Sequence, residues 1–257
     1  MSVDITVENH IATIVMNRPE AMNSIDPEQR KELYKTWDRI RDDSDIRVAI
    51  ITGAGDKAFC TGADLKNPFP APDSFAQQLF TTGKPNLTDG MDMQKPLICA
   101  VNGHAIGGGL EIAMACDLCI ASETATFGLS EAKIGSLPGA GGTQRLPRLI
   151  PRAIAMKMLL TGERIDAKEA YRVGLISDVL APDRLLPFAF ELAEKICANA
   201  PLSVRAVKML ANRGAEMALG DGLALEASIF GLLRDSDDRK EGRRAFAEKR
   251  QPQYKGS

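Results

Sequence analysis

Residues 102–111 read Asn-Gly-His-Ala-Ile-Gly-Gly-Gly-Leu-Glu, and they mark a change from strand to helix. The apolar run Leu97–Val101 predicts a buried strand before them, and apolar residues up to Ala115 predict a helix that begins at Gly107–Gly109. The first amides of a helix lack partners within it, and glycine lets a ligand oxygen approach them closely. We therefore predict an anion-stabilising turn with Glu111 beside it. A tight packing turn needs the same glycines, so that alternative stays open.

A second carboxylate, Glu131, ends a similar stretch, residues 127–131, which read Phe-Gly-Leu-Ser-Glu. A third segment, Lys57–Lys66, contains a small-residue turn at Ala63. The amide of Ala63 is a second donor that could face the amides of the glycine run, and two amides converging on one carbonyl oxygen form an oxyanion hole. Two carboxylates near such a hole can serve as base and acid on a carbonyl compound. The alternative for either glutamate is a place in a polar network.

The bulk composition is that of a soluble globular enzyme. The chain has 257 residues, 44% hydrophobic and 26% charged, enough for one large domain or a domain plus an appendage. A formal net charge of −2 gives no general attraction to nucleic acid or anionic lipid. No apolar run is long enough to span a bilayer, and Asp4 and Glu8 interrupt the first one. We expect a cytoplasmic protein, or an organellar one if a presequence has been removed.

Cysteine and histidine usage excludes several chemistries. The five cysteines, an odd number in apolar contexts, are typical of free buried thiols; they are Cys60, Cys99, Cys116, Cys119 and Cys197. Cys116 and Cys119 form a C-x-x-C for which packing is favoured over a redox or metal role. With only His10 and His104 a multi-histidine metal site is excluded, and we interpret His104 as a local hydrogen-bonding residue. Nucleotide-binding glycine loops and the serine-hydrolase G-x-S-x-G are absent.

Periodicity predicts an α/β pattern followed mostly by helices. A helix is predicted from Asp26 to Arg41, with Asp26 as N-cap and Gln29 completing a capping box. The predicted strands are Ile5–Glu8, Ile11–Met16, Arg47–Thr52, Leu97–Val101, Leu118–Ala121 and Thr126–Gly128. From Thr143 onward we predict helices separated at Gly162, Gly174, Pro182, Pro201 and Gly220–Gly222.

Taken together, the motifs resemble those of the crotonase family, which includes the enoyl-CoA hydratases and isomerases. The resemblance covers nearly the whole chain in order, and the matching segments are Met16–Asn23, Phe59–Leu65, Asn102–Glu111, Phe127–Glu131, Pro138–Arg145, Leu160–Ile165 and Glu241–Arg250. The fold implied is an α/β spiral of repeated ββα units. It would occupy residues 1–195 and carry the active site, and residues 196–257 would form a C-terminal helical region for trimerisation.

The resemblance also implies roles for individual residues. The amides of Ala63 and Gly108 would hold the thioester oxygen, Glu111 would activate water, and Glu131 would supply a proton to the α-carbon. Substrate-binding positions run along the acyl-CoA and near its adenosine end; they are Ala21, Met22, Asp64, Leu65 and Lys66. No metal or redox cofactor is implied, because CoA enters as part of the substrate. A homotrimer or a dimer of trimers is the expected assembly.

The presence of both glutamates favours an enoyl-CoA hydratase. The alternatives are a double-bond isomerase or acyl-CoA thioester hydrolase of the same family, or a non-catalytic CoA- or RNA-binding member. The acyl group stays open, although Asn67–Asn86 contains aromatics that could line its pocket or pack in a core. Arg145 is interpreted as structural or interfacial. Basic residues near the C-terminus either bind CoA phosphates or form a solvated helix end; they are Arg243, Arg244, Lys249 and Arg250.

Overall fold

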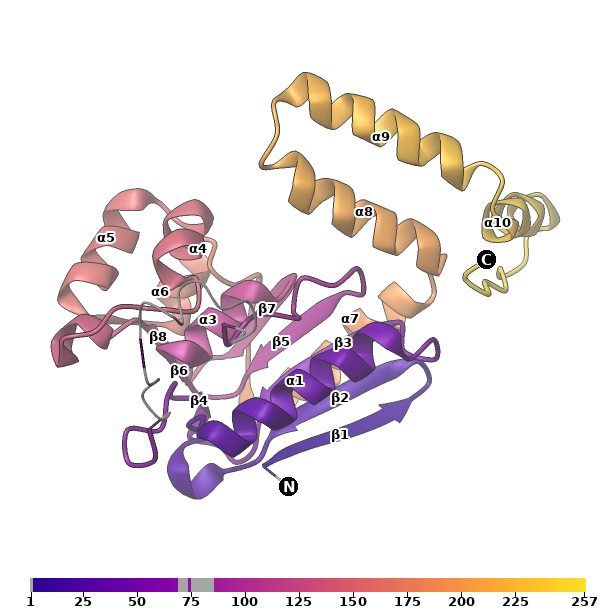
Figure 1. The fold of residues 1–257 in the computed structure, drawn as a ribbon. Helices are drawn as coiled ribbons and strands as arrows, with labels where there is room; N and C mark the ends of the chain where they lie inside the picture. Colours follow the sequence, from indigo (N-terminus) through magenta and orange to yellow (C-terminus); the bar gives the residue numbers. More distant parts are fainter. Residues whose placement is uncertain (1, 69–73, 75–85) are drawn as a thin grey trace.

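A six-stranded sheet lies at the centre of the protein, whose computed structural model describes residues 2–68, 74 and 86–257 (Figure 1). The strand order is β1-β2-β3-β5-β7-β10, with an antiparallel β1–β2 hairpin and parallel pairing thereafter. The strands are β1 (Val3–Glu8), β2 (Ile11–Met16), β3 (Val48–Gly53), β5 (Leu97–Val101), β7 (Leu118–Ser122) and β10 (Asp178–Leu180).

A second sheet has the order β4-β6-β8-β9, with β9 antiparallel to β8 and the other pairs parallel. Along the chain β3 is followed by β4, β5 by β6 and β7 by β8, and helix α3 returns the chain from β6 to β7. This repetition confirms the predicted α/β spiral of ββα units. The bounds are β4 (Ala58–Cys60), β6 (His104–Ile106), β8 (Thr126–Gly128), β9 (Arg164–Asp166) and α3 (Gly108–Ala115).

Four strands, β4, β6, β9 and β10, lie in segments where the sequence predicts none. Each has only three residues, so an alternating pattern is weak, although the equally short β8 is predicted. Their pairing depends on neighbours distant in sequence, as between Ala58 of β4 and His104 of β6. These strands are therefore products of the tertiary arrangement.

Helix α1 (Pro27–Asp42) begins where the sequence predicts, because the Asp26 side chain accepts a hydrogen bond from the amide of Gln29 at 2.8 Å. The predicted capping box is wrong. The Gln29 side chain donates to the carbonyl of Ser2 at 2.9 Å, and its Oε1 has no hydrogen-bond partner among the described residues. The hydrogen bond from Gln29 thus holds the N-terminal segment against α1.

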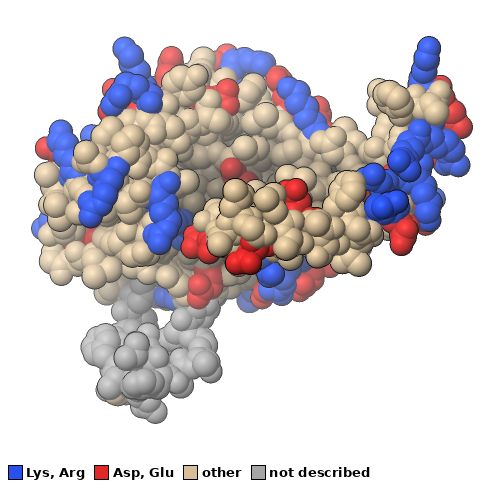
Figure 2. Space-filling view, turned by 90° about the horizontal axis from the view of Figure 1, so that it is seen from above, with Lys and Arg blue, Asp and Glu red and all other residues tan. Residues whose placement is uncertain are grey.

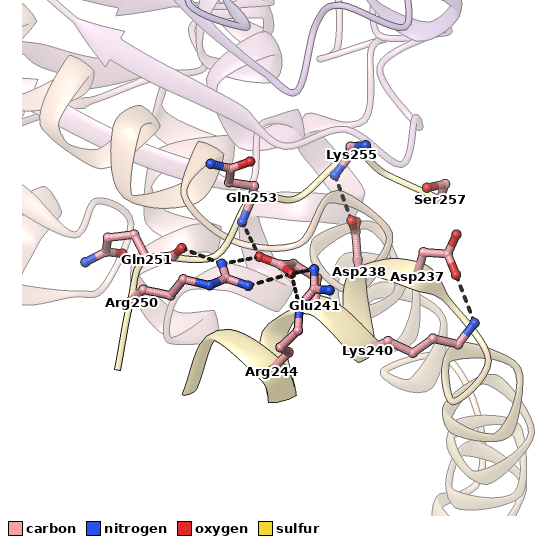
Figure 3. A pocket seen from close by; sticks show the side chains of 10 residues that line it. All are labelled: Asp237, Asp238, Lys240, Glu241, Arg244, Arg250, Gln251, Gln253, Lys255 and Ser257. Carbon is pink, nitrogen blue, oxygen red and sulfur yellow. Dashed lines mark hydrogen bonds and ion pairs between the residues drawn. The ribbon is translucent and has the colours of Figure 1, made fainter. Parts of the chain in front are cut away.

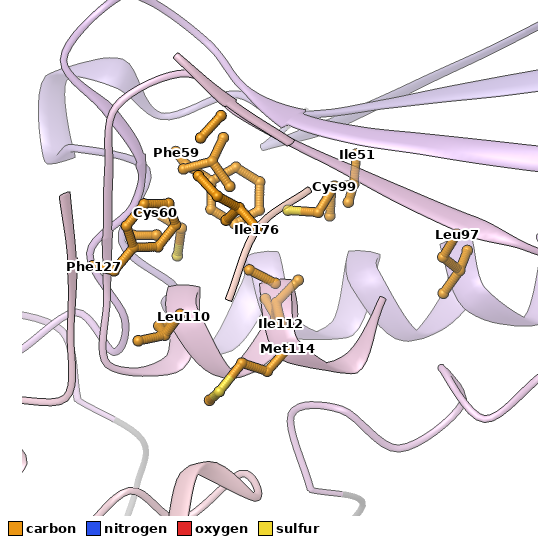
Figure 4. Close-up of a cluster of buried hydrophobic side chains, with 14 of the residues drawn as sticks. Ile51, Phe59, Cys60, Leu97, Cys99, Leu110, Ile112, Met114, Phe127 and Ile176 are labelled. Atoms are coloured by element: carbon orange, nitrogen blue, oxygen red, sulfur yellow. The ribbon is translucent and has the colours of Figure 1, made fainter. Parts of the chain in front are cut away.

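The large sheet separates two apolar layers, since successive side chains of a strand point to opposite faces. Leu97 and Cys99 of β5 face the layer that includes α1 and α3, whereas Ile98 and Ala100 face α7 (Pro182–Cys197). Figure 4 shows part of the first layer, including residues of α3 beneath the sheets. Each fully buried leucine or isoleucine there contributes roughly 1.5–3 kcal/mol. This packing holds α3, and with it the glycine turn at its start.

The C-terminal helices extend away from the two sheets (Figure 1). They are α8 (Pro201–Gly214), α9 (Leu219–Leu233) and α10 (Asp237–Glu248), and α8 packs against α9. The predicted helix break at Gly220–Gly222 is wrong, because both glycines lie in the first turn of α9. The Ala218 carbonyl accepts the amides of Asp221 and Gly222, so the turn forms despite the low helix propensity of glycine.

The remaining helical segments lie between β1 and β10. They are η1 (Pro19–Ala21), η2 (Glu131–Ile134), α4 (Gly142–Leu149), α5 (Arg152–Thr161) and α6 (Ala167–Arg172). Among the described residues, no helix combines the length and apolar character needed to cross a membrane.

Candidate active site

The glycine run opens α3, and its three glycines have different roles. Gly107 caps the helix with φ +55° and ψ −126°, a conformation that favours glycine. A Cβ on Gly109 would collide with the carbonyl oxygen of Cys60 at the end of β4. A Cβ on Gly108 would instead approach a movable side-chain atom, Leu87 Cδ2, at 2.8 Å. Packing therefore explains Gly109, and the turn at Gly107 and Gly108 has no such backbone obstruction.

The Glu111 carboxylate is buried in the first turn of α3 and is held by a distant loop. Its Oε1 accepts hydrogen bonds from the amides of Ala140, at 2.7 Å, and Gly142, at 2.8 Å. Gly142 is the first residue of α4, so the positive end of that helix faces the carboxylate. Burial raises the pKa of Glu111, while the two amides and the charge of Arg145 oppose the rise. The sequence contains no local signal for this partnership beyond the glycines after Pro138.

Glu131 lies at the start of η2, and its carboxylate is less well supported. Its Oε2 is buried without a hydrogen-bond partner among the described residues. Burial raises the pKa of Glu131, and the neighbouring charge of Glu111 raises it further. A Cβ on Gly107 would lie 3.0 Å from Glu131 Oε1, so this carboxylate borders the glycine turn. The fold thus brings both predicted carboxylates to one place.

The predicted oxyanion-hole residues also come together. A Cβ on Gly62 would lie 3.0 Å from the Gly108 nitrogen, and Gly62 directly precedes Ala63. Within the described residues, neither the Ala63 amide nor the Gly108 amide donates a hydrogen bond. The turn is anchored by Ile25, whose amide donates to the Gly62 carbonyl at 2.8 Å and whose carbonyl accepts the Asp64 amide at 2.9 Å. Two unpaired donors on adjoining turns suit a developing negative charge on oxygen.

Among the predicted substrate-binding residues, Asp64 has a carboxylate that is hydrogen-bonded within the protein. Its carboxylate accepts a hydrogen bond from Arg18 at 2.8 Å and from the amides of Lys66 and Asn67. The bond from Arg18 lowers the pKa of Asp64. The side chain therefore shapes the turn, while the side chain of Leu65 is exposed. Lys66 is exposed as well.

Ala21 and Met22 lie beside the same turn. Ala21 ends η1, and Met22 follows it with φ 55°, in the left-handed region. The hydroxyl of Thr61 donates to the Met22 carbonyl at 3.3 Å, which links this segment to the turn at Ala63. That Ala21 and Met22 lie near the adenosine end of the substrate stays a prediction.

Other sequence interpretations concern residues away from the carboxylates. His104 Nδ1 is hydrogen-bonded to Thr126 Oγ1 at 2.8 Å, which confirms its local role. All five cysteines are free; Cys60 and Cys99 are buried, and the other three are half-buried rather than fully buried as predicted. In the described part of the chain, His, Cys, Asp and Glu side chains form no group of three suited to a metal ion. Most of Asn67–Asn86, including Phe69, Phe75 and Phe80, lies outside the described residues.

Two of the four predicted basic residues of the C-terminus, Arg244 and Arg250, line a hollow of about 550 Å³ between α10 and the chain end (Figure 3). Arg250 and Arg244 both form ion pairs with Glu241, each with a closest distance of 2.6 Å. Lys and Arg side chains gather at this end of the molecule in Figure 2. Two of the four basic residues are thus already paired with a carboxylate within the chain.

Comparisons with known proteins show which family the chain belongs to. Residues 6–257 match the family model described as Enoyl-CoA hydratase/isomerase. The chain is 53% identical to (E)-benzylidenesuccinyl-CoA hydratase of Thauera aromatica, covering 100% of both chains. It is 39% identical to crotonyl-CoA hydratase of Syntrophomonas wolfei, covering 96% of this chain and 95% of the relative. A crystal structure of an enoyl-CoA hydratase from Bacillus anthracis superposes with a TM-score of 0.91, at 37% identity and full coverage of both chains. The chain belongs to the enoyl-CoA hydratase/isomerase family.

Proposed function

We propose that this protein adds water across the 2,3-double bond of a 2-enoyl-CoA thioester to give a 3-hydroxyacyl-CoA. The observation that carries the proposal is the pair of carboxylates beside the Gly107–Gly108 turn, that of Glu111 buried and that of Glu131 half-buried. Two relatives that are named hydratases, matched over 100% and 95% of their own length, support it.

The environments of the two carboxylates suggest their roles. Glu111 Oε1 accepts two amide hydrogen bonds, which favour the ionised form and suit a general base acting on water. Glu131 lacks such partners at Oε2, and its raised pKa favours the protonated form. In the proposed reaction the water oxygen bonds to the β-carbon as Glu111 takes its proton. Glu131 then delivers a proton to the α-carbon.

The thioester oxygen is proposed to rest on the amides of Ala63 and Gly108. Negative charge grows on this oxygen as water adds to the conjugated double bond, so donors fixed in advance stabilise the enolate-like intermediate. We propose that Ala21, Met22, Asp64, Leu65 and Lys66 lie along the bound thioester. No resident metal or redox cofactor takes part in the proposed steps, because CoA arrives with the substrate.

The proposal is tested by loss of absorbance of a short 2-enoyl-CoA on mixing with wild-type protein and with Glu111→Gln or Glu131→Gln. The amide keeps the volume of the carboxylate but cannot exchange the proton, so each change should lower kcat about 10²- to 10⁴-fold. Glu28→Gln, at an exposed ion pair on α1, serves as a control that should keep full activity.

A near-wild-type rate in either active-site variant would remove that residue from the mechanism. Wild-type protein that instead shifts the double bond or releases free CoA would establish the isomerase or thioester hydrolase alternative. Binding of acyl-CoA without turnover would establish a non-catalytic member. The acyl group is to be found with a panel of 2-enoyl-CoA substrates that differ in chain length and ring content.

We also propose a homotrimer or a dimer of trimers, with residues 196–257 as the assembly region and residues 1–195 as the catalytic spiral. Support comes from α9, which has no buried residue in the single chain. Its largest exposed apolar side chains are Leu219, Leu223, Phe230 and Leu232. A cytoplasmic location is proposed as well, because five free thiols suit a reducing compartment.

A further inference from the structure

The loop that holds Glu111 needs support of its own. Residues 138–142 read Pro-Gly-Ala-Gly-Gly, and Gly141 has φ +103°, in the region that favours glycine. Glycines increase the number of conformations such a loop can adopt. Two amides of this loop donate to Glu111 Oε1, so the orientation of the carboxylate depends on what restrains the loop.

Thr88 supplies one restraint from a distant part of the chain. Its side chain is 6% exposed, and its Oγ1 donates to the Ala140 carbonyl at 3.1 Å. Arg145 Nη1 donates to the same carbonyl at 2.8 Å and to Thr88 Oγ1 at 3.4 Å. Ala140 is therefore held on both sides, by Thr88 and Arg145 at its carbonyl and by Glu111 at its amide.

Asn86 adds a second restraint on the same loop. Its side-chain amide donates to the Gly139 carbonyl at 2.9 Å. That carbonyl and the Ala140 N–H belong to one planar peptide unit, so fixing the direction of one fixes the other. Between Asn86 and Thr88, the Leu87 side chain reaches the Gly108 turn, where its Cδ2 would lie 2.8 Å from a Cβ on Gly108. The short segment 86–88 thus contacts both the proposed oxyanion turn and the loop that holds Glu111.

We infer that Thr88 is a positioning residue for Glu111: its hydroxyl, with Arg145 and Asn86, fixes residues 139–140 so that the loop amides stay on the carboxylate. Thr88 does not bond to Glu111 and acts through Ala140. Only the expected effect of Thr88 on turnover rests on the proposed function. The orientation of the loop amides is a property of the protein without substrate.

Removal of the Thr88 hydroxyl has a defined electrostatic consequence. The amides of Ala140 and Gly142 lower the pKa of Glu111 against the rise caused by burial. A loop that is less firmly held donates weaker hydrogen bonds, so the pKa of Glu111 should rise. A threonine with a merely structural role would change the stability of the protein and leave the titration of Glu111 in place.

The test compares Thr88→Val, which keeps the shape and removes the hydroxyl, with Thr88→Ser, which keeps the hydroxyl. Thr36→Val is the matched control, because Thr36 is also 6% exposed and its hydroxyl donates to a backbone carbonyl, that of Glu32 at 2.9 Å. The side-chain carboxyl of Glu111 is titrated by ¹³C NMR of glutamate-labelled protein and assigned with Glu111→Gln. Thermal midpoints are measured for all variants.

We expect Thr88→Val to raise the Glu111 pKa, Thr88→Ser to restore it, and Thr36→Val to leave it unchanged. With a 2-enoyl-CoA substrate, kcat of Thr88→Val should fall about five- to tenfold, with a smaller change in KM and with the acid limb of the pH profile moved to higher pH. An unchanged Glu111 titration in folded Thr88→Val would overturn the inference, whatever its thermal midpoint. Wild-type protein without hydratase activity would overturn the proposed function but leave the titration result valid.

Discussion

Glu111 and Glu131 carry the same chemical group in different surroundings. Burial raises the pKa of both; two loop amides and the Arg145 guanidinium oppose the rise at Glu111, whereas at Glu131 only its own backbone amide opposes it. The charge of Glu111 also contributes to the raised pKa of Glu131. The same side chain thus meets different electrostatic surroundings at the two positions.

At the residue scale, Glu131→Gln should stabilise the protein at neutral pH while it lowers activity. Because the pKa of Glu131 is raised above its ordinary value of 4.5, the folded protein holds the proton more tightly than the unfolded chain. Stability from this group is complete at pH values below 4.5 and is lost as pH rises through the raised pKa. The variant escapes that loss, because glutamine does not ionise.

Thermal unfolding at several pH values measures this effect. The midpoint of Glu131→Gln should exceed that of wild type at pH 8, and the difference should shrink as the pH falls below 5. A variant that is less stable than wild type at pH 8 would show that the carboxylate has a favourable partner in the folded protein.

At the scale of elements, the contact between β4 and α3 sets the position of the site. Gly109 allows the helix to approach the Cys60 carbonyl, and Gly62 allows the neighbouring turn to approach Gly108. These contacts bring two ββα units together closely enough for one turn from each to contribute an amide. The glycines thus have a packing role, and the same run of residues contains the proposed oxyanion donor.

Gly109→Ala should destabilise the fold by roughly 1–3 kcal/mol or more, because its Cβ would collide with backbone that cannot rotate away. Gly220→Ala, in the first turn of α9, is the control, since no heavy atom lies within 4 Å of its added Cβ. That change should be neutral or stabilising by up to about 1 kcal/mol. Denaturant unfolding of both variants provides the comparison, and a neutral Gly109→Ala would show that α3 can shift away from β4.

At the scale of the whole molecule, the C-terminal helices differ from the two sheets in what they bury. α1, α3 and α7 cover the large sheet, whereas α8 has one buried residue and α9 has none in the single chain. Contiguous exposed apolar surface usually marks an interface. The single chain therefore exposes apolar surface on α8 and α9. Burial of that surface against another chain would stabilise the protein.

Leu232→Glu on α9 should lower the molar mass in solution, whereas Leu160→Glu on α5 should leave it unchanged. The two leucines are similarly exposed, at 74% and 71%, but only Leu232 lies in the proposed assembly region. Light scattering at micromolar concentration should give about three or six chain masses for wild type and less for Leu232→Glu. A monomeric wild type would contradict the proposed assembly.

Local pattern accounts for the parts of the fold that the sequence predicts well. Leu97–Val101 and Thr126–Gly128 are strands with the predicted bounds, and α3 begins within the glycine run. The Asp26 cap is also confirmed, because its hydrogen bond reaches only three residues along the chain. In each case the residues that give the sequence pattern are the same residues that form the strand, turn or cap.

By itself, the sequence determined the α/β class, the glycine turn, the two glutamates and the family. It did not determine that Gln29 bonds to Ser2, that β4 pairs with β6, or that the 139–142 loop holds Glu111. Those contacts join residues 27 to 46 positions apart, so no periodicity or neighbouring residue encodes them. Thr88 is a further case, since its partner Ala140 is 52 residues away. Only the folded chain, in which burial and backbone hydrogen bonding are satisfied together, decides which of these distant groups meet.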